Sequence, residues 1–289
     1  MRELLVAHAP AKVNIALDVL GRRSDGYHEL DTLFQELELA DDVALEPAAG
    51  PGVVMAGPEA GVAPPEEENL ALRALAGAAA AAGRDANYLV RLVKRVPIAA
   101  GLGGGSSDAA AVLRLCARVW PEIEAKIPPL ALELGSDVPY FLVGGTARGR
   151  GRGEQLERLP PLPPHDVVLF PPPDGFQVPR RKTAAVFAAL AAYSLQTPAV
   201  PRVLRAVLEG QITSRDLEGA NALEPAALSV HPGLVAHRRR VEDAIGESVA
   251  LSGAGPTWFW IGPAGSGSGI VEHARSAGLR CIVTRTASR

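Results

Sequence analysis

Short stretches in which apolar and polar residues alternate dominate the first third of the chain. A period of two places successive side chains on opposite faces, so it predicts β-strands with one buried face. Pro10 separates the first two of these stretches and is expected to end the first strand. The strands predicted in this part cover residues 4–9, 12–20, 31–39, 43–46, 53–55 and 88–95.

Segments rich in alanine and leucine, or with apolar residues at helical spacing, predict helices between and after these strands. The predicted helices cover residues 69–82, 109–120, 130–134, 183–193, 200–209, 221–228 and 235–245, with a last helix ending at Ala277. Further strands are expected at 166–170, 248–251, 257–261 and 280–284. Asn221 and Glu224 have the spacing of an N-cap and its N3 partner, so we expect the helix to start at Asn221.

A proline-dense stretch from Pro160 to Pro173 is the best candidate for a domain boundary, because helices cannot cross it. We therefore expect two domains, residues 1–160 and residues 161–289. The order of helices and strands in the second half suggests a sheet with helices on one face. The predicted fold class is α+β, and the C-terminal domain is expected to be an α+β sandwich.

Charge and cysteine content narrow the classes of function. The formal net charge is -3, which gives no electrostatic reason to expect nucleic acid or an anionic membrane as partner. We interpret the arginine clusters at 148–152 and 238–240 as solvated faces. The two cysteines, Cys116 and Cys281, suggest neither a disulfide framework nor a zinc site. No signal peptide is evident and the run Ala78–Ala82 is too short for a membrane span, so we expect a cytoplasmic protein.

The segment Pro97–Asp108, with the sequence PIAAGLGGGSSD, joins a predicted strand to a predicted helix. Glycines allow the backbone to approach a ligand closely, and helix N-terminal amides attract anions, most often phosphate. Neither the P-loop nor the dinucleotide fingerprint matches its spacing. The alternative is a tight connection that holds no ligand. If it binds phosphate, we expect a side chain at Gly104 to obstruct the phosphate.

Three further positions carry candidate chemistry. Lys12 and Asn14 share one face of their strand, and the pattern alone favours a solvent-exposed edge for them. Asp137 follows a Gly-Ser turn, where an N-cap or turn aspartate is the ordinary interpretation. Tyr27 and His28 follow the hairpin signal Asp25-Gly26 and by themselves would be an ordinary exposed pair.

Taken together, these segments resemble the GHMP kinases (galactokinase, homoserine kinase, mevalonate kinase and phosphomevalonate kinase). The resemblance covers most of the chain. Residues 97–110 are similar to the phosphate-binding motif of these kinases, and DGYHEL resembles the segment that distinguishes the diphosphocytidyl-methylerythritol kinases among them. Other similar segments are APAKVN at 9–14, GSDVPYF at 135–141 and SGAGP at 252–256.

The resemblance implies ATP-dependent phosphorylation of the 2-hydroxyl of 4-diphosphocytidyl-2-C-methyl-D-erythritol in the non-mevalonate pathway of isoprenoid precursor synthesis. In this family, Asp137 would be the catalytic base and Lys12 its electrostatic partner. Asn14 would contact the substrate. Tyr27 would stack on the cytosine and His28 would bond to its polar edge. Phe187 is either the second aromatic residue of that site or a core residue of its helix.

For ATP, the resemblance implies a binding segment formed by Pro97, Ile98, Ala99, Ala100, Gly101, Leu102, Gly103, Gly104, Gly105, Ser106 and Ser107. Gly253 and Gly255 belong to a second glycine loop that lies near the phosphates. Asn69 is either a plain N-cap or an N-cap that also contacts adenine, and Lys94 is expected near adenine. Mg²⁺ is the expected metal cofactor, with no protein ligands identified.

Two alternatives stay open at this stage. The first is another small-molecule GHMP kinase, of the homoserine or mevalonate type, although Tyr27 and His28 argue for a substrate with a base. The second is a non-catalytic nucleotide-binding regulator. Ala222 stands where the family usually has aspartate, which puts any ligand role at that position in doubt. The sequence does not predict an oligomeric state.

Overall fold

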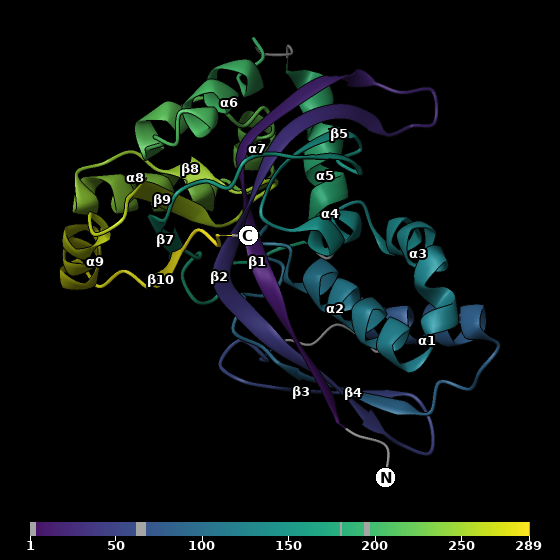
Figure 1. Ribbon diagram of the computed structural model, residues 1–289. Coiled ribbons are helices and arrows are strands. Elements are labelled where there is room, and N and C mark those ends of the chain that lie inside the picture. The colour runs from purple at the N-terminus through teal and green to yellow at the C-terminus, as the bar shows by residue number, and fades with distance from the viewer. Residues whose placement is uncertain (1–3, 62–67, 180, 194–196, 289) are drawn as a thin grey trace. The chain divides into compact units, whose positions relative to one another are not determined.

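The computed structural model describes residues 4–61, 68–179, 181–193 and 197–288 (Figure 1). The chain divides into two compact units that are interleaved in sequence. The first unit comprises residues 1–11, 39–98 and 103–144, and the second comprises 12–38, 99–102 and 145–289. The glycine-rich segment therefore contributes to both units, and the domain boundary at residue 160 stays a prediction.

Two long strands, β1 (Leu5–Arg22) and β2 (His28–Pro47), form a hairpin whose turn contains Asp25 and Gly26. The expected break at Pro10 is wrong, because β1 continues through it. Among the described strands, β1 pairs only with β2, and a proline is tolerated in an edge strand where its missing N–H faces away from the partner. The two strands predicted at 31–39 and 43–46 are likewise parts of β2.

In the first unit, β4 (Tyr88–Val93) pairs antiparallel with residues 42–47 of β2, and β3 (Gly52–Ala56) runs parallel to β4. Its helices are α1 (Leu70–Ala82), α2 (Gly104–Val119), η2 (Pro121–Lys126), α3 (Ile127–Leu134) and α4 (Val138–Val143). Figure 1 shows α1, α2 and α3 grouped together. The helix predicted at 109–120 starts five residues earlier than expected, at Gly104, so the glycine-rich segment forms its first turn.

In the second unit, β5 (Thr146–Gly151) pairs with residues 30–35 of β2 and with β6 (Gln155–Arg158). These strands were not predicted, because the segment is rich in arginine and glycine rather than in β-branched residues. Arg148 does not belong to a solvated face as expected. It makes a bidentate ion pair with Asp31, with Nε–Oδ1 and Nη2–Oδ2 distances of 2.8 and 2.5 Å.

The second unit also contains an antiparallel sheet with the order β10–β7–β9–β8. Its strands are β7 (His165–Phe170), β8 (Ala250–Leu251), β9 (Trp258–Pro263) and β10 (Ile282–Arg285). Its helical segments are α5 (Lys182–Ala189), η3 (Leu190–Ala192), α6 (Val200–Leu208), η4 (Ser214–Leu217), α7 (Glu224–Val230), α8 (Gly233–Ile245) and α9 (Gly267–Ser276).

The core of this unit joins the sheet to its helices. Phe170 and Trp258 of the sheet share one buried apolar cluster with Val241 of α8 and Ile270 of α9. In Figure 1, α8 and α9 lie beside β7, β9 and β10. The predicted α+β class is confirmed, since helices pack on antiparallel strands.

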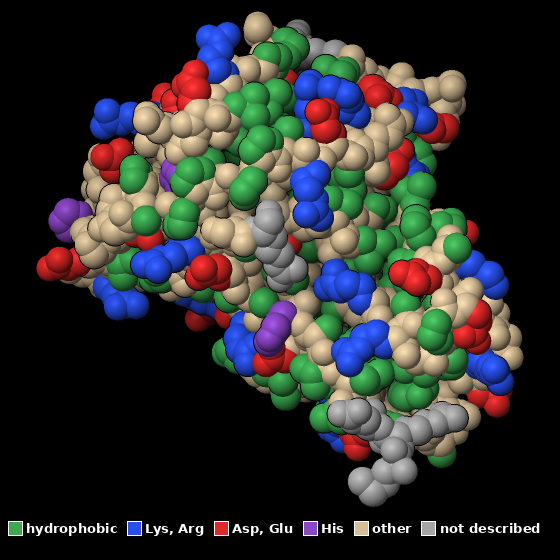
Figure 2. Space-filling model, in the orientation of Figure 1, with side chains coloured by type: hydrophobic (Ala, Val, Ile, Leu, Met, Phe, Trp, Pro, Cys, Tyr) green, Lys and Arg blue, Asp and Glu red, His purple; other side chains and the backbone are tan. Residues whose placement is uncertain are grey.

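The surface shown in Figure 2 has acidic and basic side chains interspersed over the described residues, rather than gathered into a stripe of one sign. Among these residues, no helix has both the length and the apolar character needed to cross a membrane.

Candidate active site

The first turn of α2 is built for an anion. Gly103 precedes it with a φ of +75° and makes no side-chain cap. The first amides of an α-helix lack partners within the helix, and the helix dipole makes this end positive. The Oγ atom of Ser107 is buried and has no hydrogen-bond partner among the described residues. Phosphate oxygens would satisfy both the amides and this hydroxyl, so the segment fits a nucleotide triphosphate.

The expectation for Gly104 needs correction. A Cβ there would lie 3.1 Å from Val96 Cγ1 and 3.5 Å from Lys94 Nζ, so this position faces the protein and not a ligand. Gly105 is different, because a Cβ added to it would meet nothing within 4 Å. Gly105 is also exposed and lies in the first turn of α2. The open approach to the helix N-terminus is therefore at Gly105.

A buried ion cluster supports this turn from within the first unit. The Lys94 ammonium contacts Asp41 and lies 2.5 Å from Asp108 Oδ2, and all three residues are buried. Burial raises the pKa of Asp108 to about 7, although the charge of Lys94 opposes this. For Lys94, burial lowers the pKa, but the two carboxylates outweigh it and the pKa is raised. The ammonium is thus engaged inside the protein, and its contact with adenine stays a prediction.

Asn69 confirms its predicted role as an N-cap. Its Oδ1 accepts hydrogen bonds from the amides of Ala71 (3.0 Å) and Leu72 (3.3 Å) at the start of α1. Its Nδ2 donates to the sulfur of Met55 at 3.8 Å. The second role, a contact with adenine, stays a prediction.

In the second unit, Ala99–Leu102 contact the second glycine loop. Ser252 Oγ donates to the carbonyl of Gly101 at 2.9 Å, and the amide of Thr257 donates to the carbonyl of Ala100 at 3.2 Å. A Cβ at Gly101 would lie 2.5 Å from the carbonyl oxygen of Ser252 and 2.7 Å from that of Gly255. Only glycine fits there, so the two glycine-rich segments predicted from the sequence do meet.

Asn221 does not start a helix, contrary to expectation. The cap residue of α7 is Leu223, and Asn221 instead donates from Nδ2 to the carbonyls of Leu251 and Gly253, both at 2.8 Å. Its Oδ1 accepts from the amide of Leu223 at 3.0 Å. The side chain therefore holds the second glycine loop, a long-range role that local spacing cannot reveal.

Lys12 and Asn14 are buried, so the solvent-exposed alternative is wrong. Lys12 Nζ donates to Asn14 Oδ1 at 2.6 Å, and Asn14 Nδ2 donates to Thr32 Oγ1 at 2.8 Å. The ammonium also lies 5.5 Å from the ring centroid of Phe34. A Cβ at Gly253 would be 3.6 Å from Lys12 Nζ, so the ammonium lies beside the second glycine loop. Asn14 orients Lys12, while its contact with substrate stays a prediction.

Asp137 directly precedes α4 in the first unit. It lies in a turn and occupies the N-cap position of the helix, as the ordinary interpretation expected, but its side chain makes no cap hydrogen bond with the helix. The residue is half-buried, and the helix that follows is anchored by the buried Val138, Tyr140 and Phe141. The Asp137 carboxylate is therefore placed by a helix that is packed in the core, and it makes no hydrogen bond that caps this helix.

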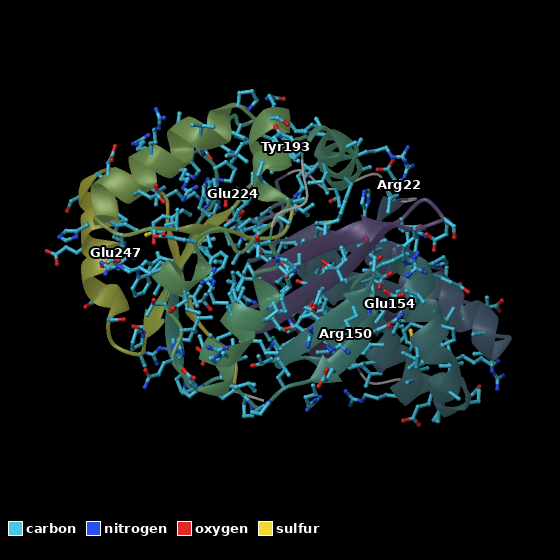
Figure 3. All side chains as sticks on the ribbon, turned by 90° about the horizontal axis from the view of Figure 1, so that it is seen from above. Arg22, Arg150, Glu154, Tyr193, Glu224 and Glu247 are labelled. Carbon is cyan, nitrogen blue, oxygen red and sulfur yellow. The ribbon has the colours of Figure 1, made fainter. Side chains whose placement is uncertain are left out.

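The three predicted aromatic residues belong to the second unit. The rings of His28 and Phe187 stack, with centroids 5.0 Å apart and planes 23° from parallel. Tyr27 is exposed, and Cζ of the Arg152 guanidinium lies 4.3 Å from the centroid of the Tyr27 ring. Burial, aided by the charge of Arg22 at the hairpin end of β1 (Figure 3), lowers the pKa of His28. At neutral pH the imidazole is therefore neutral and offers one donor and one acceptor.

Asp41, Asp108 and Lys182 were not singled out from the sequence. Arg152 was expected only as part of a solvated face, and Asn221 only as the start of a helix. Asp108 carried a usable signal, since an aspartate within an alanine-rich apolar helix needs a buried partner. The others make contacts with residues far away in the sequence, and no local pattern identifies them. The predicted residues Pro97 and Ile98 lie between β4 and the glycine turn, and Ser106 lies in the first turn of α2.

Comparison with known proteins gives consistent results. Residues 69–145 match the model of the GHMP kinases N terminal domain. A 4-diphosphocytidyl-2-C-methyl-D-erythritol kinase from Pelotomaculum thermopropionicum is 38% identical over 287 residues, which cover 98% of each chain. The protein of that name from Thermus thermophilus is 40% identical over 273 residues, covering 93% of this chain and 90% of its own.

Solved structures agree in fold. A crystal structure of 4-(cytidine 5'-diphospho)-2C-methyl-D-erythritol kinase superposes with a TM-score of 0.75 at 36% identity, covering 98% of this chain and 100% of its own. The homoserine kinase of Cytophaga hutchinsonii has a TM-score of 0.67 at 19% identity, covering 100% of this chain and 96% of its own. The second likeness shows the fold alone.

Proposed function

The chain belongs to the 4-diphosphocytidyl-2-C-methyl-D-erythritol kinase family of GHMP kinases, and we propose that it transfers the γ-phosphoryl group of ATP to the 2-hydroxyl of that compound. The products are the 2-phosphate and ADP, and the reaction is a step of the non-mevalonate route to isoprenoid precursors. The observation that carries the substrate assignment is the stack of His28 on Phe187 in a chain of this family. We also propose a cytoplasmic location.

Phosphoryl transfer depends mainly on positioning and on stabilisation of charge. Asp137 accepts the proton of the substrate hydroxyl as that oxygen attacks the γ-phosphorus. Lys12, oriented by Asn14, stabilises the negative charge of the transferred group.

The triphosphate is held by the amides at the start of α2 and by the Ser107 hydroxyl, whose Oγ otherwise has no partner among the described residues. The glycine loop 253–255 contributes backbone beside Lys12. Among the described residues, no group of three or more histidine, cysteine, aspartate or glutamate side chains could hold a metal. When bound, Mg²⁺ would neutralise negative charge on the phosphates of ATP.

Base selectivity tests the substrate assignment. We expect the cytidyl substrate to be preferred over its uridyl analogue by roughly tenfold to a hundredfold in kcat/KM, because uracil presents a carbonyl where cytosine presents an amino group. An unsatisfied buried polar group costs about 1–3 kcal/mol. Tyr27→Ala should lower kcat/KM for both substrates by the same factor, since either base can stack on the tyrosine ring. His28→Ala should reduce the discrimination itself.

Steady-state kinetics with both analogues gives these ratios for wild type and both variants. His273→Ala, at an exposed histidine of α9, is the matched control and should leave both specificity constants unchanged. Equal use of the two analogues by the wild type would contradict the cytidyl assignment and favour another GHMP kinase.

The open position at Gly105 allows a clean test of the phosphate loop. Gly105→Ala places a methyl group at the approach to the α2 N-terminus, and we expect the Kd for ATP to rise roughly tenfold. Alanine is favoured over glycine in a helix by about 1 kcal/mol, so the melting temperature should not fall. Calorimetric titration with ATP and with CDP measures the effect, and the affinity for CDP should be unchanged.

The matched control is Gly269→Ala in the first turn of α9, where an added Cβ also meets nothing within 4 Å. This variant should bind ATP as the wild type does. If Gly105→Ala binds ATP equally well, the triphosphate does not lie at this turn.

A further inference from the structure

The chain contains four lysines, and three of them are buried. Lys12 donates to Asn14, and Lys94 contacts Asp41 and Asp108. The third, Lys182, is 8% exposed and stands at the start of α5. Burying an ammonium is costly unless hydrogen bonds compensate it, so its partners indicate what the residue does.

Two hydrogen bonds of Lys182 within the second unit go to backbone carbonyls of the glycine loops. Lys182 Nζ donates to the carbonyl of Ala99 at 2.9 Å and to the carbonyl of Gly255. Ala99 precedes the first glycine turn, and Gly255 belongs to the second. One ammonium therefore joins the two segments that are proposed to surround the phosphates.

The joined backbone is held in an unusual conformation. Ala99 is the only described non-glycine residue with a positive φ, at +56°, a region that residues with a Cβ rarely adopt. The C=O and N–H of a trans peptide point in opposite directions. A carbonyl of Ala99 turned toward Lys182 consequently fixes the direction of the Ala100 amide.

Lys182 is also placed on a helix that is anchored independently of it. Val186 of α5 is fully buried in the core of the second unit, and Phe187 stacks on His28. Loss of the ammonium should therefore release the loops without moving Phe187. This separation makes the effect on nucleotide distinguishable from an effect on the cytidyl site.

We propose that Lys182 is a positioning residue for phosphoryl transfer, which clamps the Ala99 and Gly255 carbonyls so that both glycine loops receive the triphosphate in one arrangement. The inference rests on the proposed kinase function. It assigns Lys182 no contact with the reacting atoms and no proton transfer.

The test compares Lys182→Met, which keeps the chain length but loses the ammonium, with Lys182→Arg, which keeps the charge. For Lys182→Met we expect kcat/KM for ATP to fall roughly tenfold to a hundredfold and the Kd for CDP to stay within about twofold. Lys182→Arg should recover a substantial part of the loss. Lys126→Met is the matched control, because this exposed lysine also donates to a carbonyl, that of Ala81 at 2.6 Å.

Three results would overturn the inference: unchanged ATP kinetics in Lys182→Met, a parallel loss of ATP affinity, CDP affinity and melting temperature, or no recovery in Lys182→Arg. If Lys182→Met does not fold, Lys182→Gln replaces it. The same changes in kcat/KM for ATP and in Kd for CDP are then expected, and the same results would overturn the inference. A wild type that does not phosphorylate the cytidyl substrate at all refutes the proposed function instead, so the two failures are distinguishable.

Discussion

Replacement of Asp137 by asparagine is expected to lower kcat by roughly two to four orders of magnitude while ATP and CDP still bind within a few-fold of wild type. Asparagine has nearly the shape of aspartate but cannot take up the proton of the attacking hydroxyl. The residue makes no cap hydrogen bond with α4, so the replacement removes no such bond from the helix. ADP release in a coupled assay measures turnover, and calorimetry with CDP and a non-hydrolysable ATP analogue measures binding.

The matched control is Asp85→Asn, which removes the same charge at an exposed position after α1. It should leave turnover unchanged. Near-normal turnover in Asp137→Asn with the cytidyl substrate would show that Asp137 is not the base. A simultaneous loss of nucleotide binding and thermal stability would instead indicate a structural role.

Loss of the Lys12 ammonium is expected to have an effect of similar size. Lys12→Met should lower kcat by roughly a hundredfold to a thousandfold, because a preorganised positive charge near the transferred group stabilises the transition state more than the ground state. The ammonium lies beside the glycine loop 253–255 and is oriented by Asn14, so its position is defined by the protein. The KM for the cytidyl substrate should change far less than kcat.

Lys12→Arg is the second variant to measure, since it keeps the positive charge but changes the shape of the charged group. Its kcat should lie between those of the wild type and Lys12→Met. If Asp137 and Lys12 act on the same step, the double variant Asp137→Asn/Lys12→Met should lose much less than the product of the two single losses. A fully multiplicative loss, or a Lys12→Met variant with normal kcat, would contradict the proposed pairing.

Local sequence patterns predicted most of the elements. The alternation of residues 88–95 correctly predicted β4, and Asn69 caps α1 as expected. Asp25-Gly26 lies in the hairpin turn that it predicted. These features depend on φ/ψ preferences and on side chains within a few residues, which the sequence states directly.

Features that depend on distant partners were missed or wrongly interpreted. Arg148 was expected in water but pairs with Asp31, 117 positions away in the chain. Asn221 was expected to cap its own helix but holds the loop around Leu251 and Gly253. Pro10 was expected to end a strand that continues, since its effect depends on whether a second strand lies beside it. In each case the deciding contact is non-local.

Local sequence specifies which chemical groups are present, their order and their local backbone: a glycine-rich turn before a helix, a lysine on a strand and an aspartate before α4. Which of these groups are buried, and what they face, depends on the tertiary structure. Alternation assigned Lys12 and Asn14 to a polar face, whereas both faces of that part of β1 are buried. Glycine loops that are about 150 residues apart meet at Gly101, because removal of apolar surface from water brings distant segments together, and only then do backbone carbonyls and buried ammonium groups find their partners.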